Sequence, residues 1–284
     1  MMNILFNKRC LIGEGPIWNE FNNKLYHVNG YGDDEICCID LENGKNTVRK
    51  LDFGVAAMGF SKKGEMLISC LDGVFILDDD NTRTPLYDTS QYEIKYGNDA
   101  KVGPDGKFYI GTQSSKRFGT GSAIDGKLYS IDKNGSVNVL LDGLILSNGF
   151  DWSMDEKRLY HTDSDTGIIK EYTFNKGTGE IAFTGRQVNV PGVDGFTIDQ
   201  NDFLYVACWG RGHIAVVDTA DMQIKEYITV PAKIPASCCF VGKEMDKLAV
   251  VTATLGANLE KDVNAGFTFI CETKTKGRKP YLFG

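Results

Sequence analysis

The stretch SNGFDWSMDEKRLYHT, residues 147–162, contains the pattern that decides the fold. An apolar anchor, Trp152, is followed by polar turn residues and then by a short strand that begins at Arg158. The same order recurs around six anchors, which are Trp18, Phe60, Val102, Trp152, Ile198 and Phe240. Subtraction of these numbers gives spacings of 42, 42, 50, 46 and 42 residues, so the repeats fill nearly the whole chain.

Each repeat is predicted to be β-structure, because short segments rich in aromatic and β-branched residues follow the turns. The first strands after the turns include residues 24–29, 107–112, 158–162 and 203–208, and second strands follow at 35–41, 127–132, 168–174 and 213–218. Repeats of ~40 to 50 residues with about four short strands are typical of a β-propeller, whereas a parallel β-helix repeats at ~20 to 30. We therefore predict an all-β, six-bladed β-propeller with four-stranded blades around a central metal-binding channel, as one domain over residues 1–284.

Two irregular parts of the chain are assigned from the same pattern. Ring closure must join the chain ends, and the apolar pieces 3–6 and 281–283 are expected to complete one blade. The widest spacing contains residues 113–125, which are rich in Gly, Ser, Lys and Arg. These residues are predicted to form a long loop over one face.

Composition narrows the class of protein. The chain has 284 residues and a formal net charge of −7, which gives no basic footprint for nucleic acid. No apolar run approaches the ~20 residues of a membrane span, and residues 1–10 lack the apolar core of a signal peptide. We expect a cytoplasmic protein whose partners are small molecules and include neither nucleic acid nor membranes.

The eight cysteines lie within apolar runs such as 36–39 and 238–240, so reduced, buried thiols are expected. No CxxC occurs, and His27, His161 and His213 are far apart in sequence. The spacing therefore gives no zinc-finger motif.

The position four residues before each anchor carries the strongest functional signal. These six residues are Glu14, Ala56, Asn98, Asn148, Asp194 and Ala236, and four of them have a side-chain oxygen. The innermost strand of every blade lines the channel, so residues of equal phase form a ring about the axis. Two carboxylates and two amides make a cage of hard oxygen ligands that suits Ca²⁺ and, next, Mg²⁺ or Mn²⁺.

A second interpretation of two of these positions is a tight turn. Asn148 with Gly149 and Asp194 with Gly195 are common turn pairs, and the sequence uses such pairs elsewhere. Glu14 is not a turn residue, and Pro16 favours an extended conformation before it. The phase that these residues share with Glu14 favours the cage.

Five short motifs in this order resemble the senescence marker protein, gluconolactonase and luciferin-regenerating enzyme family, of which regucalcin is the animal representative. They are GEGPIW at 13–18, NDAKV at 98–102, SNGFDWS at 147–153, DG at 194–195 and SCCF at 237–240. The resemblance implies a six-bladed propeller that binds one divalent cation and hydrolyses sugar lactones, with Ca²⁺ expected and Zn²⁺, Mg²⁺ or Mn²⁺ as alternatives. It further implies that Glu14, Asn148 and Asp194 are metal ligands, that Asn98 contacts substrate and that Asp194 is the catalytic acid and base.

Two departures from the family pattern concern the substrate. Tyr96 stands where the family commonly has an arginine, and Lys116 falls where the animal branch has a glutamate after its Gly-Thr pair. We expect Tyr96 and Lys116 to contact the substrate and to move positive charge from one wall of the site to another, which suits an acidic or differently shaped lactone. Organophosphate (phosphotriester) hydrolysis with the same cation, and a non-catalytic calcium-binding or regulatory propeller, are the alternatives.

Overall fold

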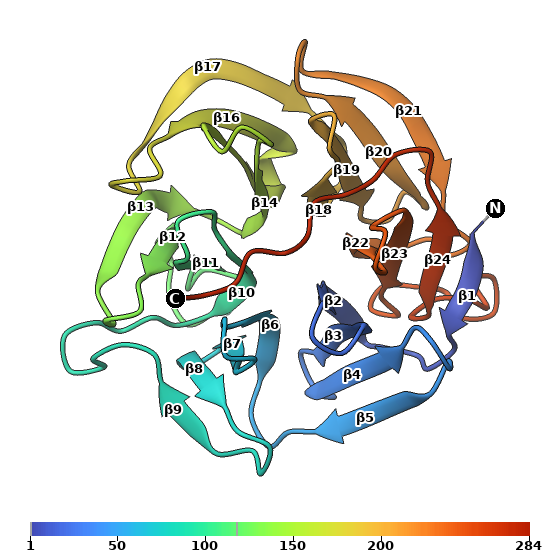
Figure 1. The fold of residues 1–284 in the computed structure, drawn as a ribbon, viewed down its shortest axis with the longest axis horizontal. Helices are drawn as coiled ribbons and strands as arrows, with labels where there is room; N and C mark the ends of the chain where they lie inside the picture. Colours follow the sequence, from blue (N-terminus) through green and yellow to red (C-terminus); the bar gives the residue numbers. More distant parts are fainter. Residues whose placement is uncertain (1, 118) are drawn as a thin grey trace.

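The computed structural model describes residues 2–117 and 119–284, and these form six four-stranded antiparallel sheets arranged in a ring. Figure 1 shows the sheets as the blades of a propeller, which confirms the predicted fold. The first three blades are built from consecutive strands: β2 (Ile12–Asn19), β3 (Lys24–Gly30), β4 (Glu35–Asp40) and β5 (Asn46–Lys50); β6 (Val55–Phe60), β7 (Met66–Cys70), β8 (Gly73–Leu77) and β9 (Arg83–Pro85); β10 (Gly97–Val102), β11 (Phe108–Thr112), β12 (Gly126–Ile131) and β13 (Val137–Leu144).

The last three blades follow the same plan, except that the sixth borrows a strand from the beginning of the chain. Their strands are β14 (Ser147–Trp152), β15 (Arg158–Asp163), β16 (Ile168–Phe174) and β17 (Ile181–Asn189); β18 (Val193–Ile198), β19 (Phe203–Cys208), β20 (His213–Asp218) and β21 (Gln223–Thr229); β22 (Pro235–Val241), β23 (Lys247–Thr252), β24 (Thr268–Glu272) and β1 (Asn3–Phe6). The only helical element among the described residues is the 3-10 turn η1 (Ser164–Thr166). No helix in the described chain is long and apolar enough to cross a membrane.

The six anchors lie at or next to the ends of the innermost strands, and all are buried. Where the anchor is aromatic, a tyrosine from the preceding blade can pack edge-on against it: ring centroids are 4.8 Å apart for Tyr109 and Trp152, and 5.1 Å apart for Tyr205 and Phe240. Such edge-to-face pairs add to the free energy of burying the rings. The repeated anchor is therefore the side chain that joins one blade to the next.

Ring closure differs in part from the prediction. β1 pairs with β24 and completes blade 6, as expected for residues 3–6. Residues 281–283 belong to no blade. The chain after β24 (the C-terminal tail, residues 273–284) instead crosses the ring, where Phe283 forms a parallel bridge with Ser61 of blade 2 and Gly284 donates to the Gly106 carbonyl of blade 3 at 3.0 Å. The prediction for 281–283 was wrong because one strand already fills the edge of blade 6.

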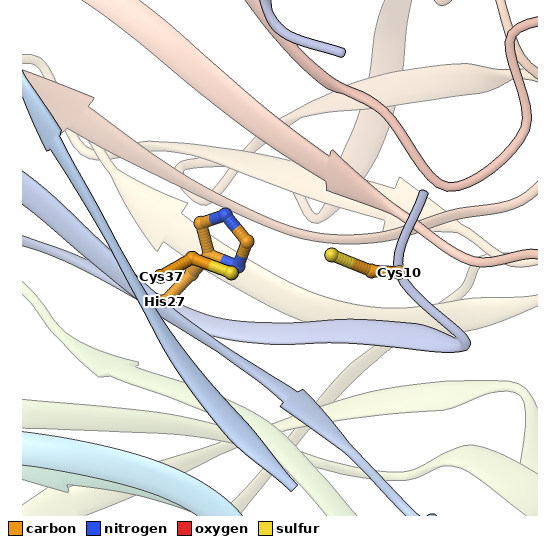
Figure 2. Close-up of side chains that lie close together, drawn as sticks. All are labelled: Cys10, His27 and Cys37. Carbon is orange, nitrogen blue, oxygen red and sulfur yellow. The ribbon is translucent and has the colours of Figure 1, made fainter. Parts of the chain in front are cut away.

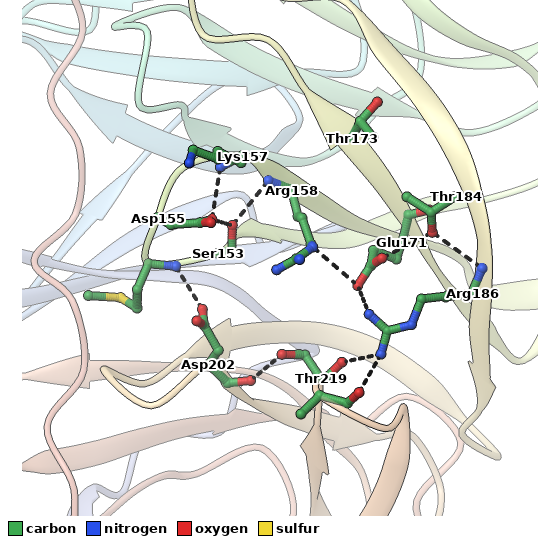
Figure 3. Close-up of polar contacts among 12 residues, drawn as sticks. Ser153, Asp155, Lys157, Arg158, Glu171, Thr173, Thr184, Arg186, Asp202 and Thr219 are labelled. Carbon is green, nitrogen blue, oxygen red and sulfur yellow. Dashed lines mark hydrogen bonds and ion pairs between the residues drawn. The ribbon is translucent and has the colours of Figure 1, made fainter.

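Polar contacts also connect neighbouring blades, both near the outer strands and at turns that follow the innermost strands. Arg186 of β17 pairs with buried Glu171 of β16 at 2.8 Å and donates to the Thr219 and Ala220 carbonyls of blade 5, each at 2.7 Å (Figure 3). Asp202 of blade 5 accepts a hydrogen bond from the Met154 backbone of blade 4 at 2.7 Å. One guanidinium thus satisfies a buried carboxylate and two carbonyls at once, which makes this junction a specific one.

All eight cysteines are free thiols, and seven of them are buried, as expected from their apolar surroundings. The described part of residues 113–125 forms the predicted loop, with no strand between β11 and β12.

Candidate metal and substrate site

A break in strand register places the phase-equivalent residues. Each innermost strand pairs irregularly with its neighbour at this position, with shifts between Glu14 and Ile17, Val55 and Ala57, Gly97 and Ala100, Ser147 and Phe150, Val193 and Phe196, and Pro235 and Ser237. β-Bulges locally bend a strand and re-aim side chains, and they are common beside functional sites. The fold thus repeats one device six times, once at each position of the ring.

The two Asn-Gly and Asp-Gly pairs lie inside strands β14 and β18, so the turn interpretation does not hold. Their glycines allow neighbouring inner strands to approach closely. A Cβ atom on Gly149 would lie 2.4 Å from the Asp194 carbonyl, and one on Gly195 would lie 2.1 Å from the Ser237 hydroxyl. Glycine follows each ligand candidate here because the next blade occupies the space of a side chain.

Glu14, Asn98, Asn148 and Asp194 line a single pocket of about 680 Å³. Residues that the repeat pattern did not indicate complete its wall: Ile12, Tyr31, Gln113, Arg117, Leu146, Ser164, Asp165, Gly192, Val193, Trp209 and Leu255. Most of these lie in loops between blades or strands, where the repeat phase carries no information. The four residues of the predicted oxygen-bearing ring thus lie on one surface, while their chemical roles remain predictions.

The pocket concentrates negative charge in a buried place. Burial raises the pKa of Glu14 well above its usual range, and the charges of Asp194 and Asp99 raise it further. Burial, followed by the charge of Asp99, likewise raises the pKa of Asp194. Burial also raises the pKa of Asp99 to about 6, against the opposing effect of Lys101. Like charges held in a low-dielectric channel favour the binding of a cation or of protons.

Asn148 supplies a direct test of whether these residues fit a cation. Its amide nitrogen donates to Asp194 Oδ1, while its own Oδ1 is buried and has no hydrogen-bond partner among the described residues. A buried carbonyl oxygen without a partner costs about 1–3 kcal/mol, so such groups point to a missing ligand. Oxygen atoms from Glu14, Asn148 and Asp194 are the donors that hard divalent cations prefer. The residues present therefore fit the expected cation.

Asn98 is held rigidly beside this cluster. Its Oδ1 accepts hydrogen bonds from the Tyr31 hydroxyl at 2.8 Å and from Gln113 Nε2 at 3.2 Å, and its Nδ2 donates to the Ser147 carbonyl at 3.0 Å. An amide nitrogen has two hydrogens, so one further donor can serve a substrate oxygen. Tyr31 and Gln113 fix the direction of that donor.

Tyr96 and Lys116, the two residues that depart from the family pattern, lie outside the pocket lining. Tyr96 has a left-handed backbone (φ 57°), and its hydroxyl contacts Thr120 Oγ1 at 2.9 Å, within the 113–125 loop. Lys116 is exposed, and neither residue lines the pocket. Arg117 does line it, bonded to Gln113 Oε1 at 3.2 Å and to Asp165 Oδ1 at 2.8 Å. The positively charged side chain that lines the pocket is thus Arg117, one residue beyond the predicted Lys116.

The C-terminal tail covers the opposite end of the channel (Figure 1). Arg278 of the tail pairs with buried Asp151, which also accepts from Lys101 at 3.0 Å. A cavity of only about 50 Å³ remains between the ring and the tail. The larger opening to the channel is therefore the pocket that holds Glu14 and Asp194.

Comparison with known proteins identifies relatives that match nearly the whole chain. Residues 12–254 match the model of the SMP-30/Gluconolactonase/LRE-like region. YvrE of Bacillus subtilis (strain 168), named provisionally as a sugar lactone lactonase, is 31% identical over 97% of this chain and 96% of its own, and regucalcin of Gallus gallus is 28% identical over 97% and 95%. The crystal structure of a calcium-binding protein, regucalcin, from Agrobacterium tumefaciens shares the fold with a TM-score of 0.88 and 24% identity, over 99% of this chain and 96% of that one. The chain described here therefore belongs to the SMP-30/gluconolactonase/LRE-like family.

Proposed function

We propose that this protein is a divalent-metal-dependent hydrolase of a small lactone, with Glu14, Asn148 and Asp194 as the residues that hold the cation. The observation that carries the proposal is the partnerless Oδ1 of Asn148, buried beside two carboxylates whose charges repel. Names among the relatives point the same way, since one is a provisional sugar lactone lactonase. Ca²⁺ is the ion we expect, because the ligands are all oxygen atoms.

A divalent cation bound there would polarise the lactone carbonyl, which lowers the barrier to attack by several kcal/mol. Asp194 acts as the base: its carboxylate takes a proton from the attacking water while the water oxygen bonds to the carbonyl carbon. The ring C–O bond then breaks, and the same proton passes from Asp194 to the alkoxide that leaves. The product is the open-chain hydroxy acid.

Asn148 and Asn98 orient the reactants. The hydrogen bond from Asn148 Nδ2 to Asp194 Oδ1 fixes one oxygen of the base and leaves the other oxygen to take the proton. Asn98, clamped by Tyr31 and Gln113, offers its remaining N–H to a substrate oxygen. A donor that is held in place before substrate arrives loses little entropy on binding.

Arg117 and Trp209 supply the outer wall of the pocket. The guanidinium of Arg117 is part exposed and paired with Asp165, so it can exchange this partner for a substrate carboxylate or hydroxyl. Trp209 offers an apolar face for the sugar ring. Tyr96 affects the substrate indirectly, because its hydroxyl bonds to Thr120 in the loop that carries Arg117.

A substrate panel tests the proposal. Purified protein with Ca²⁺, Mg²⁺, Mn²⁺ or Zn²⁺ is assayed on aldonolactones, on acidic sugar lactones and on organophosphate triesters. The proposal requires the largest kcat/KM for a lactone and loss of that activity on chelation. A higher kcat/KM for phosphotriesters would establish the organophosphatase alternative, and metal-dependent melting without turnover would establish a calcium-binding or regulatory propeller.

A further inference from the structure

Three soft ligand groups meet at the junction where the ring closes. Cys10 lies between β1 and β2, His27 lies on β3 and Cys37 lies on β4. One ligand atom of each residue lies within 4.8 Å of the others, and all three side chains are buried. Figure 2 shows the Cys10 and Cys37 sulfur atoms pointing toward the His27 ring. No spacing motif in the sequence indicates this cluster.

We propose that Cys10, His27 and Cys37 form a second metal site, which binds one thiophilic d¹⁰ cation, Zn²⁺ or Cu⁺. Two thiolates and an imidazole are the ligands that these ions prefer, whereas Ca²⁺ and Mg²⁺ prefer oxygen. This site is distinct from the pocket that holds Glu14 and Asp194, whose lining contains no sulfur atom among the described residues. The two sites therefore differ in their ligand atoms, which are sulfur and nitrogen in this cluster and oxygen in the pocket.

Histidine geometry suits such a ligand. His27 Nδ1 lies 3.1 Å from the Val28 carbonyl, and Nε2 lies 3.1 Å from Thr268 Oγ1. Whichever nitrogen coordinates the metal, the other has an oxygen atom that can accept its N–H. A second-shell acceptor of this kind fixes the tautomer and the ring orientation of most metal-binding histidines.

The charged side chains around the cluster do not compensate the negative charge of two thiolates. The charges of Lys8 and Glu35 affect the Cys37 thiol, but the two side chains are paired with each other at 2.7 Å, so their charges cancel. Two thiolates in this buried place would therefore lack a counter-charge unless a metal is present. Binding releases the thiol protons in exchange for the cation, which leaves the site neutral with Zn²⁺ and singly negative with Cu⁺.

The cluster is placed where a metal would stabilise closure of the ring. The Cys10 backbone donates to the Gly266 carbonyl at 2.9 Å and accepts from Thr254 at 3.0 Å, so this segment belongs to blade 6. His27 and Cys37 belong to blade 1. A cation held by all three would join the first blade to the last at the place where the ring closes.

The test uses the full-length protein, reduced and stripped of metal. It is titrated with Zn²⁺ and, anaerobically, with Cu⁺ against competing chromophoric chelators, and with Co²⁺ as a spectroscopic substitute. We expect one equivalent that gives a thiolate-to-cobalt charge-transfer band in the near ultraviolet, which an oxygen-only site cannot give. The band should disappear in Cys10→Ala and Cys37→Ala, with affinity more than ~100-fold weaker, and should persist in Cys70→Ala, an equally buried control.

Two readouts on the wild-type protein need no variant. X-ray absorption at the zinc or copper edge should show sulfur in the first shell, and saturation at about 100-fold above Kd should raise Tm by about 5–10 °C. A first shell of oxygen and nitrogen alone, a band that survives in both cysteine variants, or a Cys10–Cys37 disulfide in the purified protein would each overturn the proposal.

Discussion

Asp194→Asn should separate the two effects of the channel carboxylates. In cation-free protein, burial and the charge of Asp99 raise the pKa of Asp194. A carboxyl with a raised folded-state pKa contributes stability below its unfolded pKa, and this contribution is lost as pH rises through the folded value. The raised pKa of Asp194 therefore costs stability at neutral pH, and the isosteric amide, which still accepts from Asn148, removes that cost. We expect the chelated variant to melt at or above the wild-type temperature.

The cation should reverse this order. At a free Ca²⁺ concentration of about 100 times its Kd, the wild-type protein gains about 2.7 kcal/mol, whereas a variant with ~100-fold weaker affinity gains about 0.4. At ~2–4 °C per kcal/mol, calcium should raise Tm by about 5–10 °C in the wild type and about 1 °C in the variant. Loss of the base should also lower kcat/KM by about 10²–10⁴-fold.

The matched control is Asp165→Asn, which removes a pocket carboxylate that is part exposed and paired with Arg117. It should keep most of the calcium-dependent shift. The assay is differential scanning calorimetry in chelator and in calcium, followed by lactone turnover. An Asp194→Asn variant that keeps the full shift would show that Asp194 is not a cation ligand, and one that melts several degrees lower in chelator would show that its carboxyl group does not destabilise the cation-free protein.

Three further predictions concern the pocket and its support. Because burial and repulsion raise the pKa of Glu14 and Asp194, protons compete with the cation. Calorimetric titration should show Kd rising as pH falls, by up to ~10-fold per pH unit for each proton that the cation displaces; a pH-independent Kd would contradict this. Gly195→Ala places a Cβ atom 2.1 Å from Ser237 Oγ and should lower the free energy of unfolding by about 1–3 kcal/mol, measured in urea. Adding Ser237→Gly should partly restore that stability. An unchanged free energy of unfolding would show that the blades are not in close contact. Arg117→Gln should raise KM for acidic lactones more than for neutral ones, and equal effects on both would remove Arg117 from substrate recognition.

The fold was predictable because one anchor per blade sets the repeat, and the repeat sets which strand lines the axis. That phase alone brought Glu14, Asn98, Asn148 and Asp194 to one pocket. It could not show the bulges that aim these residues, because a register shift leaves no periodic signal. It also left Asn148–Gly149 open to a turn interpretation, since the need for glycine comes from the neighbouring blade.

The loop and tail were harder for a related reason. Arg117 rather than Lys116 reaches the pocket because the 113–125 loop has no repeat phase to fix its side-chain directions. Residues 281–283 are apolar like an edge strand, but they pack across the channel end once β1 fills blade 6. His27 and Cys37 are cross-strand partners on β3 and β4, and Cys10 joins them only where the ring closes, which no sequence spacing records.

In the proposed function, an oxygen-bound divalent cation in the channel is required for lactone hydrolysis. Metal analysis and lactone turnover on one sample test this requirement, before chelation, after chelation and after calcium is restored, in the wild type and in Glu14→Gln. We expect one oxygen-site cation per chain, activity that disappears and returns with it, and little recovery in the variant unless calcium is raised. Full lactonase activity in chelated protein would contradict it.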